Sequence, residues 1–184
     1  MDELQLWSAA LKGDDRAFSK IFDKHQVRVV RHAAHFFDER CDAEDVAAVA
    51  FLELWRLRRR VRIVNGSVLP WLLATTTNVA RNTIRSFRRY NHLLHSLPRD
   101  SNAMTDPAEA IENQLSSQQA RLLEHAMRSI SRTDSTLLIL TAIEGLSTAD
   151  AARAIGIKPD TARVRLHRAK ATARQILNIP EVTP

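Results

Sequence analysis

The stretch that decides the fold is Ser147 to Arg174, STADAARAIGIKPDTARVRLHRAKATAR, which has the pattern of two short helices around a glycine turn. Ser147 can cap the first helix, and Asp150 three residues later completes a capping box that satisfies free backbone amides. Gly156 stands where a tight turn needs positive φ, and Pro159 stands where a second helix can begin. The stretch therefore predicts a helix-turn-helix.

The second predicted helix has one apolar stripe, and its other faces are basic. Its apolar residues recur at spacings of three and four: Ala162, Leu166, Ala169, Ala173 and Ile176. A helix-turn-helix places its second helix in the DNA major groove. We therefore predict DNA contacts from the polar residues of this helix and its start: Lys158, Thr161, Arg163, Arg165, His167 and Arg168. The alternative is an ordinary helical hairpin whose basic face is solvated.

Composition favours a helical protein with a polyanionic partner. The chain has 184 residues, 45% of them hydrophobic, with only 4 glycines and 6 prolines. Its net charge of +6 and its isoelectric point near 10.2 indicate a polyanion, without distinguishing DNA from RNA or a membrane surface.

Several classes of protein are disfavoured by what the sequence lacks. A lone Cys41 excludes an intramolecular disulfide and a cysteine-cluster zinc site. No apolar run could span a bilayer and MDELQ is not a signal peptide, so we expect a cytoplasmic protein without membrane insertion. His25, His32 and His35 have no carboxylate cluster nearby, which favours satisfied or solvated histidines over a metal site. With no phosphate loop and no nucleophile–base arrangement, we expect no enzyme activity, cofactor or metal.

Helical periodicity continues upstream of the helix-turn-helix. We expect helices over Leu4 to Leu11, from a cap at Asp14 or Asp15 to about His35, and from a cap at Asp42 through DAEDVAAVAFLELWRLRRR. After a turn at Asn65 and Gly66, a helix from about Pro70 to Tyr90 follows. Its candidate core residues are Trp71, Leu72, Thr75, Val79, Ile84 and Phe87.

The span from Leu54 to Arg99 contains ten arginines and no Asp or Glu. A protein surface that serves solubility alone normally has acidic and basic residues interspersed. Arginines neutralise phosphates, aromatic rings stack on exposed bases and amides recognise base edges. With Trp71, Phe87, Tyr90 and a run of Thr and Asn residues, this span therefore predicts a nucleic-acid surface.

We predict an all-α fold of two small helical domains joined by a flexible linker, the second domain containing the helix-turn-helix. The linker is assigned to residues 96–112, where periodicity is lost and Pro98 and Pro107 occur. The domains are then residues 1–95 and 113–184, and Ser131 with Asp134 is expected to cap a helix in the second.

Three segments in this order resemble the bacterial sigma-70 family, specifically its extracytoplasmic-function (ECF, group IV) RNA polymerase sigma factors. They are AEDVAAVAFLELW, PWLLATTTNVARN followed by arginines, and IEGLSTADAARAIGIKPDTARVRLHRAK. The resemblance implies a region 2-like domain over 1–95 and a region 4-like domain over 113–184. It also implies binding to core RNA polymerase and promoter DNA, with regulation by a separate anti-sigma factor.

The resemblance assigns roles to individual positions. Binding to the clamp helices of the polymerase's largest subunit is implied for Glu44, Asp45, Phe51, Leu54, Trp55 and Arg56; region 4 is expected to meet the polymerase flap. Recognition and melting of the minus-10 element is implied for Arg62, Asn65, Thr76, Asn78, Arg81, Asn82, Arg85 and Arg88. The helix-turn-helix would then recognise the minus-35 duplex.

Two other functions remain open at this point. A stand-alone helix-turn-helix repressor or activator explains Ser147 to Arg174 but leaves the acid-free span without a role. An RNA-binding adaptor would prefer RNA over promoter DNA.

Overall fold

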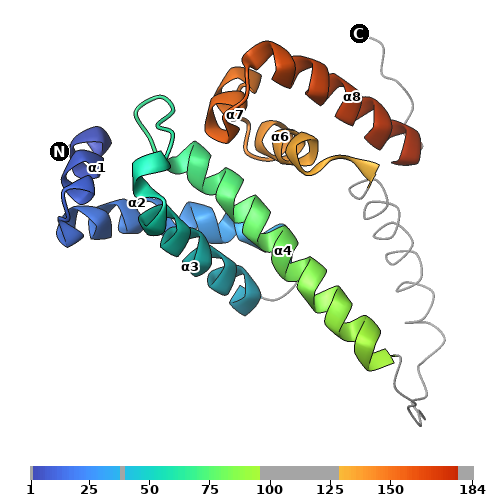
Figure 1. The fold of residues 1–184 in the computed structure, drawn as a ribbon, viewed down its shortest axis with the longest axis horizontal. Coiled ribbons are helices and arrows are strands. Elements are labelled where there is room, and N and C mark those ends of the chain that lie inside the picture. The colour runs from blue at the N-terminus through green and yellow to red at the C-terminus, as the bar shows by residue number, and fades with distance from the viewer. Residues whose placement is uncertain (1, 38–39, 96–128, 178–184) are drawn as a thin grey trace.

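The structure, a computed structural model of the chain, describes residues 2–37, 40–95 and 129–177. Within these ranges it is built of α-helices, as predicted, with one isolated antiparallel bridge between Val64 and Ser67 (Figure 1). In chain order the elements are α1 (Glu3–Leu11), α2 (Asp15–Ala34), α3 (Arg40–Arg56), the 3-10 turn η1 (Arg58–Arg60), α4 (Leu69–His95), α6 (Arg132–Ala142), α7 (Thr148–Ile155) and α8 (Pro159–Leu177).

Acidic side chains cap the first two helices. Asp2 forms a capping box with Gln5 at the start of α1, and Asp14 accepts from two backbone N–H groups of the first turn of α2. The prediction that Asp42 caps α3 is wrong, because α3 begins at Arg40 and Asp42 lies within its first turn. A carboxylate there still complements the positive end of the helix dipole.

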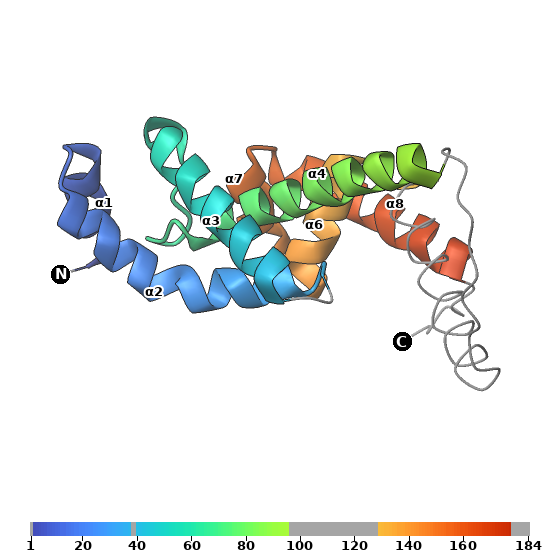
Figure 2. The ribbon, with the colours of Figure 1, turned by 90° about the horizontal axis from the view of Figure 1, so that it is seen from below.

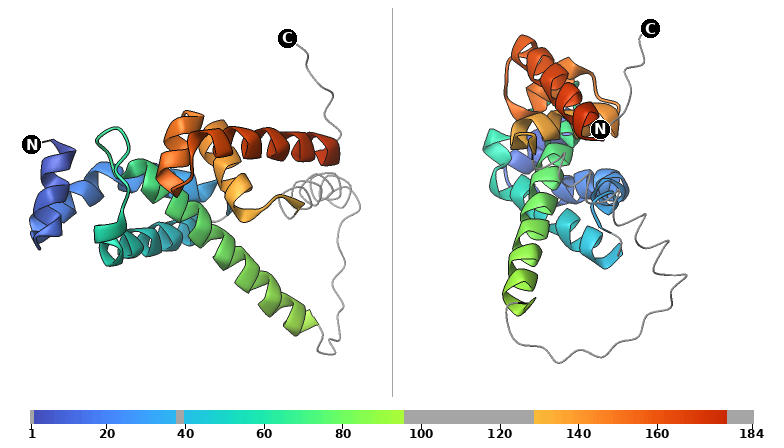
Figure 3. Two further views of the ribbon diagram at one scale, coloured as in Figure 1. Left: turned by 45° about the horizontal axis from the view of Figure 1, so that its top comes forward. Right: turned by 90° about the vertical axis from the view of Figure 1, so that its right-hand side faces the viewer.

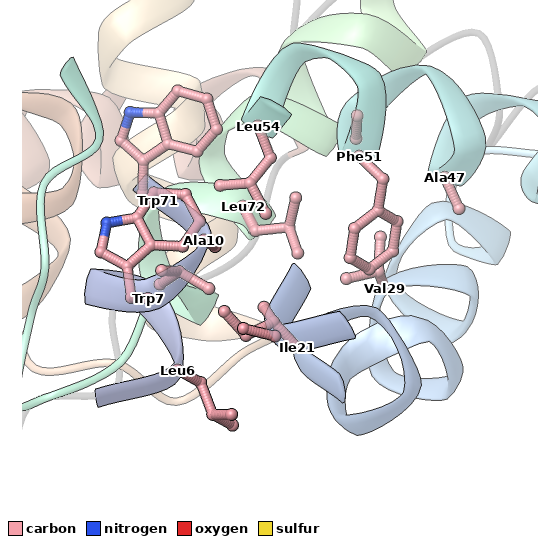
Figure 4. Packing of buried hydrophobic residues seen from close by; sticks show 13 residues of the cluster. Leu6, Trp7, Ala10, Ile21, Val29, Ala47, Phe51, Leu54, Trp71 and Leu72 are labelled. Atoms are coloured by element: carbon pink, nitrogen blue, oxygen red, sulfur yellow. The ribbon is translucent and has the colours of Figure 1, made fainter. Parts of the chain in front are cut away.

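Helices α1 to α4 enclose the first hydrophobic core (Figure 4). The rings of Phe22 on α2 and Phe51 on α3 lie 4.6 Å apart between centroids. The fully buried centre of this core is formed by Ile21, Val29, Ala50, Leu54, Val68 and Leu72. Apolar burial of this kind is the main favourable contribution to folding.

A second core joins α6, α7 and α8 to α4. Leu137, Leu140, Ala151 and Leu166 from the C-terminal helices pack in one cluster with Leu73 of α4. Figures 1 and 2 show these three helices beside the middle and first half of α4. Helix α4 therefore contributes to both cores, which the prediction of two separate helical domains did not include.

The C-terminal half of α4 extends beyond the other described helices (Figure 3). Sequence periodicity placed Phe87 in the core, but its side chain is 63% exposed. That prediction is wrong because, among the described helices, few residues lie close enough to the second half of α4 to cover its apolar stripe.

Two predicted segments lie outside the described residues. These are the linker at 96–112 and the first part of the second predicted domain, residues 113–128. Among the described helices, none combines the length and the apolar character that crossing a membrane requires.

Candidate nucleic-acid interface

Helices α7 and α8 form the predicted helix-turn-helix. The Ser147 hydroxyl accepts from the N–H of Asp150 at 3.0 Å, which caps α7. Gly156 ends α7 in the left-handed conformation, with φ of 78°. The N–H groups of Gly156 and Ile157 both donate to the carbonyl of Ala152, at 2.9 and 3.0 Å, so the turn is closed by backbone hydrogen bonds.

The start of α8 presents the side chains predicted to contact DNA. Its buried stripe consists of Ala162, Leu166 and Ala169. The exposed predicted residues are Lys158, Thr161, Arg163, His167 and Arg168. Arg165 differs, because it is half-buried and its Nε donates to Asp134 of α6 at 2.5 Å.

Sequence analysis missed one residue of this exposed face. Val164 lies between Thr161 and Arg168 at helical spacing and is 52% exposed. An apolar side chain in the major groove can contact a thymine methyl group. The sequence could not show that Val164 is exposed, because a single valine among basic residues does not reveal whether its side chain is buried.

The loop between η1 and α4 has a fixed conformation. Asn65 and Gly66 both have positive φ, 52° and 77°, and the residues flanking them, Val64 and Ser67, exchange backbone hydrogen bonds of 3.0 and 3.1 Å. Arg62 and Asn65, two of the predicted minus-10 residues, have exposed side chains in this loop.

Buried Glu3 of α1 holds the end of this loop. One of its carboxylate oxygens accepts from the Ser67 hydroxyl and the Val68 N–H, both at 2.8 Å, and lies 3.0 Å from His25 Nε2. The other oxygen accepts from Lys24 at 2.7 Å. Burial alone would raise the pKa of the Glu3 carboxyl, but these neighbours outweigh it and lower its pKa to about 2.

This lowered pKa predicts an acid-sensitive loop anchor. The folded pKa lies below the ordinary value of 4.5, so the stabilisation is fully present above about pH 4.5 and is lost as pH falls toward 2. Glu3→Gln removes the titrating group and should flatten the pH dependence of the melting temperature in that window. The loss for the native chain should be on the order of 3 kcal/mol, measured by thermal unfolding at several pH values. Equal slopes for both proteins would contradict this role.

A groove of about 950 Å³ runs between α3 and the exposed part of α4. Residues that line it include Val49, Leu57, Asn78, Asn82, Phe87 and Tyr90. Asn78 Oδ1 is buried, and it has no hydrogen-bond partner among the described residues. Exposed aromatic rings and the amide side chain of Asn78 therefore line one groove, a chemistry suited to a single-stranded base.

The remaining predicted minus-10 residues differ in how exposed their side chains are. Arg85 and Asn82 are exposed on α4, whereas Arg81 is half-buried against α6. Thr76 is a correction, because it is fully buried and its hydroxyl donates to the Leu72 carbonyl at 2.9 Å, which leaves it no access to DNA. The side chain of Arg88 lies outside what the structure describes.

The predicted polymerase-binding residues of α3 also differ in how far their side chains are buried. Glu44, Asp45 and Arg56 are exposed, and Arg56 pairs with Glu53 at 2.6 Å. Trp55 is half-buried against Phe18, with ring centroids 4.9 Å apart. Phe51 and Leu54 belong to the first core, so their assignment to a docking surface is corrected.

Two apolar residues that sequence analysis did not assign to docking lie on the exposed face of α3. Leu52 is 67% exposed and Val49 is 43% exposed. With Asp45 and Arg56 they follow helical spacing along one side of α3, which we call the α3 face. The α3 face is therefore the candidate protein-docking surface of this helix.

Comparison with known proteins identifies both parts of the chain. The family model for sigma-70 region 2 matches residues 21–90, and the model for sigma-70 region 4 matches residues 120–172. The sigma factor CarQ of Myxococcus xanthus is 29% identical over 90% of this chain and 91% of its own length. The ECF sigma factor SigE of Mycolicibacterium smegmatis is also 29% identical, over 90% of this chain and 64% of that longer protein.

The fold has a solved counterpart as well. The structure of CnrH in complex with the cytosolic domain of CnrY matches with a TM-score of 0.55 and 21% identity, covering 97% of this chain and 99% of that chain. The region 2 match shows that the arginine-rich N-terminal half is also part of a sigma factor. A stand-alone helix-turn-helix regulator is therefore ruled out. The chain belongs to the sigma-70 family of RNA polymerase sigma factors, in its ECF group.

Proposed function

We propose that this chain binds core RNA polymerase and directs it to promoters, with α8 on the minus-35 duplex and the loop and α4 on the minus-10 strand. The observation that carries the proposal is the presence of two separate basic surfaces in a chain that matches both sigma regions. Polymerase supplies the catalysis, and this chain supplies binding energy. We also propose that it acts in the cytoplasm.

Opening the promoter requires compensation for lost base stacking. Flipping one base out of the duplex costs a few kcal/mol. Phosphate contacts from Arg62 and Arg85 and capture of a base in the groove beside Asn78 offset that cost. The rigid loop held by Glu3 keeps Arg62 and Asn65 beside the strand that is captured.

The exposed α3 face is the proposed contact with the polymerase clamp helices, and the C-terminal helices are proposed to meet the flap. The anti-sigma partner that the family resemblance implies is proposed for this chain on the same basis. CnrH, whose fold is similar, was solved with the cytosolic domain of CnrY bound to it.

In vitro transcription tests the proposed function directly. Core polymerase with this chain should initiate from a subset of a promoter library, and polymerase without it should not. If the chain neither binds core polymerase nor changes which promoters are transcribed, the proposal is wrong. Preference for RNA over promoter DNA in direct competition would favour the RNA-binding adaptor instead.

We expect Arg168 to contact a phosphate of the minus-35 duplex. Arg168 is exposed on α8 beyond the first turn, where side chains face the DNA backbone more than the bases. Arg168→Ala should weaken binding to all duplexes alike and lower the salt slope of binding by about one. The measurement is a salt titration of duplex affinity. The matched control is Arg16→Ala, which removes an exposed arginine of α2. A loss confined to one duplex sequence would instead indicate a base contact.

A further inference from the structure

We propose that Val164 determines base preference in the minus-35 duplex by packing against the C5-methyl group of a thymine. The inference rests on the proposed promoter-binding function, and it assigns one specificity-determining side chain to α8. Two observations carry it. Val164 is exposed at the centre of the outward face of α8, and Arg165, its neighbour in the sequence, is already held within the protein.

Val164 lies opposite the buried stripe of α8. Side chains two positions apart on a helix point about 200° apart, so Val164 points away from Ala162 and Leu166, which are both buried. The residue is 52% exposed, and α8 lies along an outer edge of the described fold (Figure 1). Its position is in the N-terminal half of α8, the end from which a recognition helix meets base edges.

The fold does not require an apolar side chain at position 164. A β-branched side chain is restricted to one favoured rotamer in a helix, so valine is a weaker helix former than alanine. Among the described residues, Val164 belongs to none of the three apolar clusters. Alanine or a polar residue would therefore serve the free protein at least as well.

The surroundings of Val164 favour DNA over a protein partner. Exposed cations lie along the same helix and its start: Lys158, Arg163, Arg168 and Lys170. Asp160 is the only acidic residue of α8, and its carboxylate lies 3.2 Å from Arg163 Nη1. A single apolar group within a basic face matches the DNA major groove, where the thymine methyl group lies between two phosphate backbones.

Arg165 is bound to α6 and fixes the rotation of α8. Its Nε donates to Asp134 Oδ1 at 2.5 Å, and its Nη2 donates to the Ser131 hydroxyl at 3.4 Å. Ser131 in turn caps α6, since its hydroxyl accepts from the Asp134 N–H at 3.2 Å. This charge-assisted contact joins one side of α8 to the start of α6, so the opposite side turns outward.

In this orientation α8 presents Thr161, Val164 and Arg168 in one row, at spacings of three and four residues. Thr161 can exchange hydrogen bonds with DNA, and Arg168 binds a phosphate one turn after Val164. Val164 between them has no polar group. A donor or acceptor of a base held against it would lose water without gaining a partner, whereas a thymine methyl group gains an apolar contact. Val164 therefore selects thymine by attraction and disfavours other bases by desolvation.

Selection from a promoter pool randomised across the minus-35 element tests the assignment, with the full chain bound to core polymerase. The native chain should select thymine at one position. Val164→Ala should lose that preference and keep the preferences at the other positions. Because Val164 is exposed, this variant should fold as the native chain does.

Replacing the selected thymine by uracil then removes only the methyl group. This replacement should weaken native binding about fourfold, the factor expected for burial of one methyl-sized group. Val164→Ala should bind the thymine and uracil duplexes equally. Val27→Ala is the matched control, because it shortens an exposed valine of α2 and should leave both the selected sequence and the uracil effect unchanged.

Three results would overturn the proposal while leaving promoter selection intact. Uracil could weaken the native chain and Val164→Ala equally, or it could weaken neither. Val164→Ala could also lower binding to every promoter by the same factor, which would indicate that Val164 contacts protein. A native chain that selects no minus-35 sequence with core polymerase would instead contradict the proposed function itself, and this inference with it.

Discussion

Replacing Leu52 by aspartate should strongly weaken binding to core RNA polymerase while leaving the fold intact. Leu52 is 67% exposed on α3, so a polar side chain there does not disturb a core, and exposed substitutions usually change stability by no more than about 0.5 kcal/mol. In an interface, however, a charge at an apolar contact is left desolvated and unpaired. We expect affinity to fall at least about thirtyfold, the scale of a central apolar contact. Fluorescence titration with core polymerase measures it.

Two further substitutions make the result specific. Val27→Asp places the same charge on an exposed apolar residue of α2, where we expect no effect on polymerase binding. Leu54→Ala, only two residues from Leu52, should instead destabilise the fold by about 2–5 kcal/mol, since Leu54 is fully buried. Unchanged polymerase affinity in Leu52→Asp would remove the α3 face from the interface.

Local features of the fold were predictable because each depends on residues close in sequence. The cap at Ser147, the left-handed Gly156 and the start of α8 at Pro159 are each determined within a few positions, and the structure confirms all three. The all-α class follows from the same periodicity and caps. The boundary of α3 was predicted less well, since a carboxylate in the first turn and one at the N-cap satisfy the same dipole.

Contacts between distant residues were not predictable. Glu3 meets the loop 65 positions later, and Glu144 meets His32 112 positions earlier. In the sequence, each of these acids is indistinguishable from a solvated surface carboxylate. The division of α3 into buried Leu54 and exposed Leu52 has the same cause, because apolar residues occur on both sides of that helix and only its neighbours decide which side is covered.

The run Thr75 to Asn78 shows how the structure sharpens the candidate site. Thr76 is fully buried with its hydroxyl on the Leu72 carbonyl, whereas Asn78 lines the groove beside α3 and its Oδ1 has no partner among the described residues. Side chains two positions apart on a helix point about 200° apart, so both cannot face one strand of DNA. Of these two residues, only Asn78 lines the groove, so we propose Asn78, and not Thr76, as the residue that holds a base.

Asn78→Ala should impair promoter opening much more than it impairs folding. The amide oxygen has no hydrogen-bond partner among the described residues, so the melting temperature should change little. Loss of an amide that binds a base edge removes about 1–3 kcal/mol, which lowers open-complex formation by roughly tenfold or more. Permanganate reactivity of the melted thymines measures that loss, with duplex minus-35 affinity as the internal reference. Thr76→Val, which fills the same buried space without the hydroxyl, should leave permanganate reactivity unchanged. If the two variants melt promoters equally well, base capture does not occur at Asn78 and must lie elsewhere along the groove.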